Sequence, residues 1–131
     1  MTTETKTRTI TLTDRRPVTI RESEWPELAS ATGDSFRGDV GRYQQARARG
    51  EIDTYSLRVR QHADGRAIVY GVLDAAIAAW RQPAGGEDHR GGELLDGGSD
   101  LAAALRRVGE SCRLPDSVIR DAVADLPAET I

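Results

Sequence analysis

The chain has 131 residues, a formal net charge of -3, and 38% hydrophobic and 5% aromatic residues. This length suits one domain, spanning residues 1–131, with a single modest core. The lack of a long apolar run argues against a membrane-spanning helix, and the polar N-terminus is unlike a secretion signal, so we expect a cytoplasmic protein. Cys112 is the only cysteine, which excludes an intrachain disulfide.

Residues 1–6 are expected to form a flexible tail, and residues 7–23 a first β-hairpin. Apolar residues alternate there with threonine and arginine, which is typical of strands with one buried face. A three-residue loop at residues 14–16 places Leu12 opposite Val18. This segment therefore predicts a half-buried antiparallel hairpin.

A short helix is predicted over residues 23–31, with Ser23 as its N-cap and Gly33 beyond its end. Trp25 lies on the apolar side of this helix. We expect its ring to be part of the core, and an interface position is the alternative.

Residues 34–54 mix turn formers with helix formers, so we expect a loop followed by a helix over residues 40–49. The exposed side of this helix carries Arg42, Arg47 and Arg49. These side chains form either a basic patch for nucleic acid or an acidic partner, or an ordinary solvated helix surface.

A second hairpin is expected over residues 55–73, where two runs of strand-forming residues meet at Asp64 and Gly65. The Asp-Gly pair suits a two-residue type I′ turn, which places Ala63 opposite Arg66. In this register one face of the hairpin gathers the apolar side chains of Tyr55, Leu57, Val59, Ile68, Tyr70 and Val72.

The opposite face of this second hairpin is mixed in character. Arg58, Arg60 and His62 of the first strand lie beside Val69 and Leu73 of the second strand. A face that is partly basic and partly apolar suits a partner protein or a second copy of the chain, so these five residues are the candidate partner-binding site. Binding of single-stranded nucleic acid is disfavoured, because the aromatic side chains needed for base stacking fall on the other face.

Residues 74–83 predict a short helix that begins at Asp74, or else a continuation of the preceding strand. Residues 82–98 are rich in glycine and are expected to form a flexible linker.

Two helices are expected at the C-terminal end. Ser99 is the predicted N-cap of the first helix, and the second helix begins near Pro115. Each helix has one apolar side, so the two helices should pack together and on one face of the sheet. The fold class is therefore α+β, with an antiparallel sheet from two β-hairpins packed against a C-terminal helical hairpin.

This helix pair has the approximate layout of a helix-turn-helix motif. Gly109 occupies the small-residue position of the first helix, and Leu114 and Ile119 occupy buried positions. Arg113 stands where such motifs usually have glycine, and the second helix carries three acidic residues against Arg120 alone. An acidic helix is poorly suited to approach phosphates, so plain helix packing is the favoured interpretation.

Motifs for chemistry are lacking. His62, His89 and Cys112 are the only histidine and cysteine residues, and no two of them have the spacing of metal ligands. The glycine clusters match neither a P-loop nor a dinucleotide-binding pattern. We therefore expect no catalytic residue, no metal and no cofactor, and the chain is not predicted to be an enzyme.

The favoured hypothesis is a non-enzymatic protein-binding module, whose partner could include a second copy of the chain. In general character it is similar to the accessory and inhibitory proteins of phages and plasmids, although no motif carries this likeness. The alternative is a DNA-binding regulator that uses the C-terminal helix pair or the Arg-rich middle region. The residues for that role are Arg42, Arg47, Arg49 and Arg120.

Overall fold

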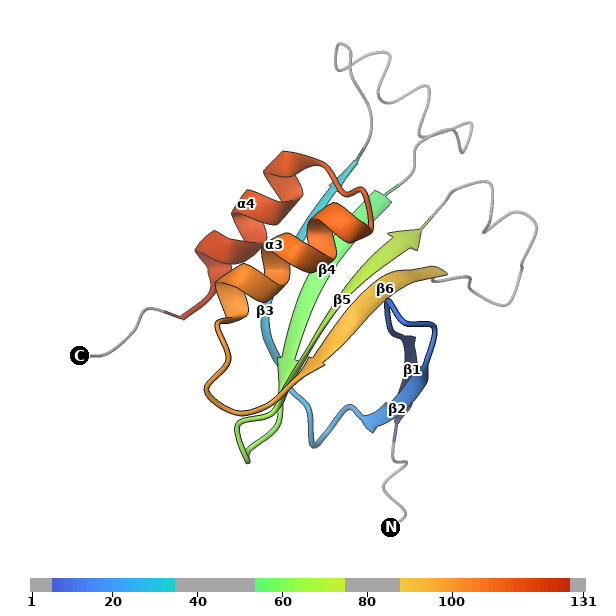
Figure 1. The fold of residues 1–131 in the computed structure, drawn as a ribbon, viewed down its shortest axis with the longest axis vertical. Helices are drawn as coiled ribbons and strands as arrows, with labels where there is room; N and C mark the ends of the chain where they lie inside the picture. The colour runs from blue at the N-terminus through green and yellow to red at the C-terminus, as the bar shows by residue number, and fades with distance from the viewer. Residues whose placement is uncertain (1–5, 35–53, 75–87, 128–131) are drawn as a thin grey trace.

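The computed structural model describes residues 6–34, 54–74 and 88–127. They form an α+β fold with two antiparallel sheets and two C-terminal helices, which confirms the predicted fold class (Figure 1). The two-stranded sheet pairs β1 (Thr7–Thr11) with β2 (Pro17–Arg21). The four-stranded sheet has the order β3 (Glu27–Asp34), β4 (Thr54–Gln61), β5 (Ala67–Asp74), β6 (Asp88–Leu95), and the helices are α3 (Leu101–Ser111) and α4 (Asp116–Asp125).

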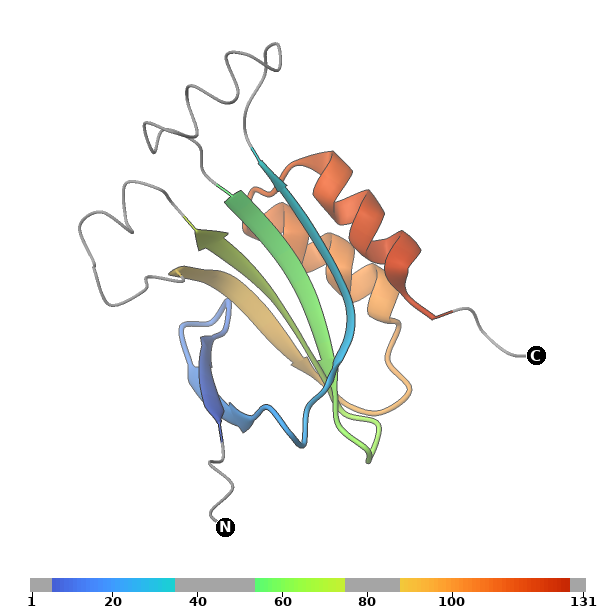
Figure 2. The same cartoon turned by 180° about the vertical axis from the view of Figure 1, so that it is seen from behind.

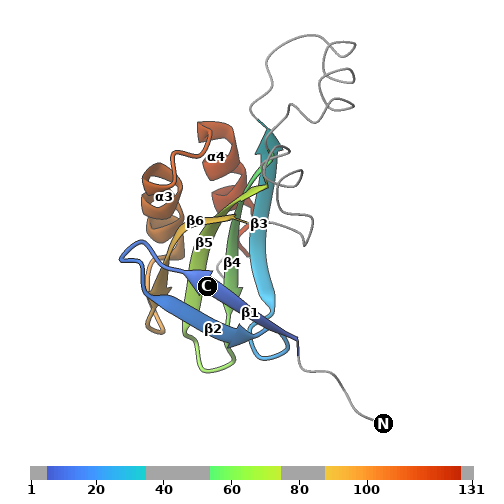
Figure 3. The ribbon, with the colours of Figure 1, turned by 90° about the vertical axis from the view of Figure 1, so that its right-hand side faces the viewer.

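The larger sheet lies between two layers. The helices cover one face, with α4 over β3 and α3 over β5, and the β1–β2 hairpin packs on the other face (Figure 2). This hairpin runs across the strands of the larger sheet rather than along them (Figure 3). Neither helix in the described part of the chain is long and apolar enough to cross a membrane.

The turn between β4 and β5 corrects the sequence prediction. His62 N–H donates to Arg66 O at 2.8 Å and Gly65 N–H donates to His62 O at 3.0 Å, so residues 63–65 form a three-residue loop. Gly65 has a φ of 97°, as expected for the last loop residue of this hairpin type. Val59 therefore pairs with Val69, and the predicted two-residue turn is wrong by one residue.

Because of this one-residue difference, every side chain of β5 points to the opposite face of the sheet from the one predicted relative to β4. The predicted single apolar face is therefore also wrong. Leu57 and Val59 lie on the helix side of the sheet together with Val69. Ile68 and Tyr70 point to the other side, where they pack beneath the β1–β2 hairpin. The central strand β5 is thus buried on both faces.

The β1–β2 hairpin has the predicted face but not the predicted pairing. Ile10 pairs with Val18, two residues away from the expected register, around a loop in which Arg15 has a φ of 69°. A shift of two residues keeps every side chain on its original face. Ile10 and Trp25 are accordingly buried in the core between the two sheets, which confirms the prediction for Trp25.

Two further element predictions are wrong. Glu27–Asp34 is strand β3 and not part of a helix, because Ala29 is buried against the helix layer while β3 pairs with β4. Asp88–Leu95, predicted to be flexible linker, is strand β6, which pairs with β5 and completes the sheet. The predicted helix over residues 40–49 lies outside the described residues, as does most of the predicted helix after Asp74, which itself ends β5.

The two C-terminal helices form the predicted hairpin. Asp100, and not Ser99, caps α3 by accepting a hydrogen bond from Ala103 N–H at 3.1 Å. Just beyond the end of α3, Arg113 has a φ of 56°, and Leu114 N–H donates to Gly109 O at 2.9 Å. A Cβ atom at Gly109 would lie 2.4 Å from Ile119 Cγ1, so only glycine lets α4 approach this closely.

Candidate functional site

The structure brings together only part of the predicted partner-binding site. Arg58, Arg60 and His62 follow one another at alternate positions from β4 into the turn, on the side of the β1–β2 hairpin. Val69 is 0% exposed and lies on the opposite, helix-covered face, so the predicted mixed face does not exist. Leu73 pairs with Tyr55 near the end of β5.

Arg60 is held in a network that joins the two sheets. Its Nε donates to Tyr70 Oη at 2.9 Å, and a terminal nitrogen donates to the backbone oxygen of Trp25 at 3.2 Å. The same guanidinium lies 3.9 Å from Glu22 Oε1, and only 12% of its side chain is exposed. Arg60 therefore supports the fold and offers little surface to a partner.

Glu22 is the anionic centre of this network. Its carboxylate accepts a hydrogen bond from Arg8 Nε at 2.9 Å and lies 3.6 Å from Lys6 Nζ. The hydrogen bond from Arg8 is the main cause that lowers the pKa of Glu22, and the charges of Arg8, Lys6 and Arg60 lower it further against the opposing effect of burial. The network therefore holds the β1–β2 hairpin on the larger sheet through an ionised carboxylate.

Arg58 lies on a polar strip formed by β3 and β4. Its Nε is 3.9 Å from Glu27 Oε1, and 24% of its side chain is exposed. On the same face the hydroxyl groups of Thr32 and Ser56 are 3.1 Å apart. These groups are bonded to one another across the strand pair, as expected for residues at closely spaced ladder positions.

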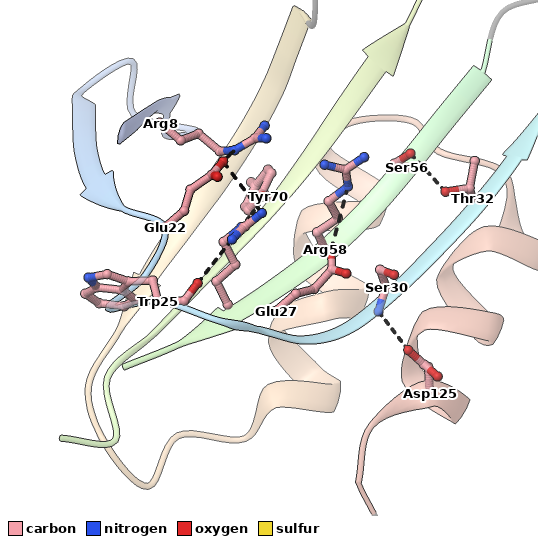
Figure 4. A network of polar contacts seen from close by, with 11 residues as sticks. Arg8, Glu22, Trp25, Glu27, Ser30, Thr32, Ser56, Arg58, Tyr70 and Asp125 are labelled. Atoms are coloured by element: carbon pink, nitrogen blue, oxygen red, sulfur yellow. Dashed lines mark hydrogen bonds and ion pairs between the residues drawn. The ribbon is translucent and has the colours of Figure 1, made fainter. Parts of the chain in front are cut away.

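The outer edge of β3 is protected by a side chain from α4. Ser30 N–H donates to Asp125 Oδ2 at 2.9 Å, although the two residues are far apart in sequence (Figure 4). An unpaired strand edge invites pairing with another chain, and a carboxylate that occupies one of its donors reduces this tendency.

His62 is fixed at the turn end of the sheet. Its ring centroid lies 5.1 Å from that of Trp25, at an interplanar angle of 57°, and Asp64 N–H donates to His62 Nδ1 at 3.1 Å. Arg66 places its guanidinium 5.3 Å from the Trp25 ring and bonds Asp64 Oδ2 at 2.8 Å. The backbone N–H of Arg66 is the main cause that lowers the pKa of Asp64, and the Arg66 side chain lowers it further.

Two open grooves meet at this end of the molecule. One of about 620 Å³ lies between the β2–β3 connection and the β4–β5 turn, and one of about 770 Å³ lies between β3, β4 and the ends of the two helices. They share Leu28 and Gln61, and together we call them the trough. Residues that characterise the first groove are Glu24, Pro26, Glu27, Leu28, Gln61 and His62. Those of the second are Leu28, Gln61, Ser99, Asp100, Leu101 and Leu126.

Sequence patterns indicated only His62 among these trough residues. The others come from segments that are distant in the chain, and tertiary packing alone brings them together. Leu28 was assigned to a helix, Gly98 to the glycine-rich linker, and Ser99 to the N-cap of the helix that follows. The strand register is irregular between Glu27 and Ala29, so the sequence around Leu28 lacks the regular alternation that would mark a strand.

The residues proposed for DNA binding are placed only in part. Arg42, Arg47 and Arg49 lie outside the described residues. Arg120 is exposed on α4 and lines a groove of about 300 Å³ between the helices. That groove also contains Arg106, Glu110 and Asp116, so its basic and acidic side chains balance.

The chemical groups of the described residues do not form a metal site: no cluster of three or more His, Cys, Asp or Glu side chains could hold an ion there. Comparisons of the chain with models of known protein families, with curated proteins and with solved structures gave no match. The function is therefore inferred from the geometry of the trough and its surroundings.

Proposed function

We propose that this chain is a non-enzymatic protein-binding module that holds a segment of a partner protein in the trough. The observation that carries the proposal is the junction of the two grooves at Leu28 and Gln61. Apolar side chains bordered by a few polar groups are typical of sites that bind a ligand or peptide in a defined orientation.

The walls of the trough belong to well-supported elements. His62 is held by Trp25 and by the turn, and Gln61 N–H donates to Pro26 O at 3.1 Å. Leu101 and Leu126 pack at their inner sides against the core between helices and sheet. A preformed surface of this kind loses little conformational entropy when a partner binds.

The titratable groups of the trough support binding rather than acid–base catalysis. Glu24 and Glu27 form ion pairs with Arg21 and Arg58, and Asp100 caps α3. Each of these carboxylates thus has a structural partner within the chain, as is typical of a binding surface.

Site-specific photo-crosslinking tests this proposal. A photoreactive amino acid is introduced at Ala63 or Ser99, which are both exposed at the trough, and as a control at Asp121 on the outer face of α4. After irradiation in the cells that produce the protein, we expect covalent protein adducts from the two trough positions and none from Asp121. The proposal fails if adducts form equally from all three positions or only from Asp121.

The identity of the adduct separates the finer hypotheses. A product of twice the chain mass would indicate a homodimer, and a component of a host defence system would support an inhibitory role for a phage or plasmid protein. Salt-dependent binding to duplex DNA, lost when Arg42, Arg47, Arg49 and Arg120 are changed together, would instead favour the DNA-binding alternative. The acidic residues beside Arg120 weigh against that alternative.

A further inference from the structure

We infer that the partner segment held in the trough carries lysine or arginine on both sides of an apolar residue. This inference rests on the proposed protein-binding function and specifies the chemistry of its ligand. The juxtaposition that supports it is an apolar centre at Leu28 between acidic side chains in each groove.

The charge of the trough has one sign. Glu24 and Glu27 line the first groove and Asp100 lines the second, whereas no lysine or arginine lines either groove among the described residues. The Glu24 and Glu27 side chains are 52% and 43% exposed. Such a surface attracts cationic groups and repels acidic ones.

The two glutamates retain capacity for a cationic ligand. Arg21 lies 3.7 Å from Glu24 Oε1, and Arg58 lies 3.9 Å from Glu27 Oε1. Both separations exceed the range of a hydrogen bond, so these are ion pairs without direct hydrogen bonding. A lysine or arginine of the partner could donate to either carboxylate, and a charge-assisted hydrogen bond is stronger than the long ion pair already present.

The apolar requirement comes from the centre of the trough. Leu28 contributes to both grooves, and it is partly buried against the helix-side core together with Leu101 and Leu126. The exposed parts of these side chains leave apolar surface that a partner's aliphatic or aromatic side chain would cover. Gln61 adds a neutral polar group at the same junction, suited to the backbone of the bound segment.

Peptide display on the intact protein tests the inference. A library of random peptides is selected against the full chain. We expect the enriched peptides to contain lysine or arginine before and after an apolar residue. Enrichment of acidic peptides, of peptides without charge preference, or of none at all would overturn the inference.

A neutralised variant then locates the interaction. Glu24→Gln, Glu27→Gln and Asp100→Asn are combined, because each change removes a charge at nearly constant size and asparagine still caps a helix. We expect the affinity of an enriched peptide to fall by about threefold to a hundredfold, the range that is typical of losing three exposed ion pairs. Its dependence on salt should weaken as well.

The matched control changes three acids outside the trough, Glu110→Gln, Asp116→Asn and Asp121→Asn, and should leave the affinity within about twofold. Thermal unfolding of both triple variants verifies that they remain folded. An unchanged affinity in the trough variant, or an equal loss in the control, would overturn the inference. If uncharged peptides bind and the substitution Leu28→Glu abolishes their binding, the protein-binding function is retained and only the inferred charge of the ligand is wrong.

Discussion

The two β-hairpins of this protein have the same type of loop, but the error in the predicted strand register differs between them. Both have three-residue loops whose last residue has a positive φ, Arg15 in the β1–β2 hairpin and Gly65 in the β4–β5 hairpin. The first register differs from its prediction by two residues and the second by one. Only the second difference changes which side chains are buried together.

This contrast follows from the period of a strand. Because side chains alternate between faces, an even error leaves the buried set intact and an odd error exchanges one strand's two faces. The β1–β2 hairpin has one polar and one apolar face, so its pattern determines which face is buried. Strand β5 is apolar on both faces, from Ala67 to Val72, so its pattern cannot determine the register.

Truncation of core residues should give the largest effects. Leu57→Ala and Ile68→Ala remove side chains from opposite faces of the larger sheet, and each should lower the free energy of unfolding by about 2–5 kcal/mol. In the first hairpin Thr9→Ala should cost less than about 1 kcal/mol, because Thr9 is exposed and its hydroxyl shares an exposed hydrogen bond with that of Thr19 across the strands. Urea denaturation measures all three.

A double-mutant cycle adds a direct test of the register. Val59→Ala and Val69→Ala should show a coupling energy of about 0.5 kcal/mol or more, since the two side chains face each other across the strands. Val59→Ala and Tyr70→Phe, the pair expected from a two-residue turn, should be additive. Coupling in the second pair and additivity in the first would contradict the observed register.

Substitution of the two loop residues with positive φ should change the free energy of unfolding by intermediate amounts and in opposite directions. Gly65→Ala should lower the free energy of unfolding by about 1–2 kcal/mol, because a Cβ atom disfavours its φ of 97°. Arg15→Gly should raise it by about 0.5 kcal/mol, since the relief of strain slightly exceeds the added entropy of the unfolded chain. Thermal unfolding measures both, and equal signs would indicate that one loop has a different conformation in solution.

The smallest expected difference between the two hairpins is in how strongly their stability depends on acid pH. The pKa of Glu22 is lowered in the folded state, chiefly by Arg8, so its stabilisation is complete above the pKa of an unfolded glutamate and is lost as pH falls through the folded value. Glu22→Gln should therefore cost about 1 kcal/mol at neutral pH and make stability less sensitive to acid.

The matched comparison for Glu22 is Asp64→Asn in the second hairpin. The pKa of Asp64 is also lowered, chiefly by the backbone N–H of Arg66, but its side chain is 44% exposed against 17% for Glu22. We expect a weaker change in acid sensitivity from this variant, measured by unfolding at a series of pH values. A larger effect at Asp64 would place the main acid-sensitive contact in the turn.

The sequence allowed prediction of the features that depend on local signals. The fold class, the presence of both hairpins and the C-terminal helix pair with its apolar sides were all accessible in this way. Strands β3 and β6 were not, because Glu27–Asp34 and Asp88–Leu95 are rich in glycine, alanine or charged residues and poor in β-branched ones. They are strands because β4 and β5 offer them partners, and no local pattern contains that information.

The same limit applies to the candidate site. Arg58, Arg60 and His62 were correctly placed along one side of their strand, but most of the trough is assembled from β3 and the helix ends. Since the first half of β3 was predicted to be helical and the segment up to Gly98 to be a linker, these surfaces could not be combined from sequence. The role of Arg60 as a support for Tyr70 and Trp25 likewise depends on the β1–β2 layer.

Because Cys112 is buried, the rate at which its thiol is modified can measure how often the helix layer opens. It is the only cysteine in the sequence, is 5% exposed, and packs against β5 so closely that a Cβ atom at Gly71 would lie 2.9 Å from its sulfur. A thiol reagent can reach it only when the end of α3 separates from the sheet. The rate of modification therefore reports that separation in the unmodified protein, without an added label.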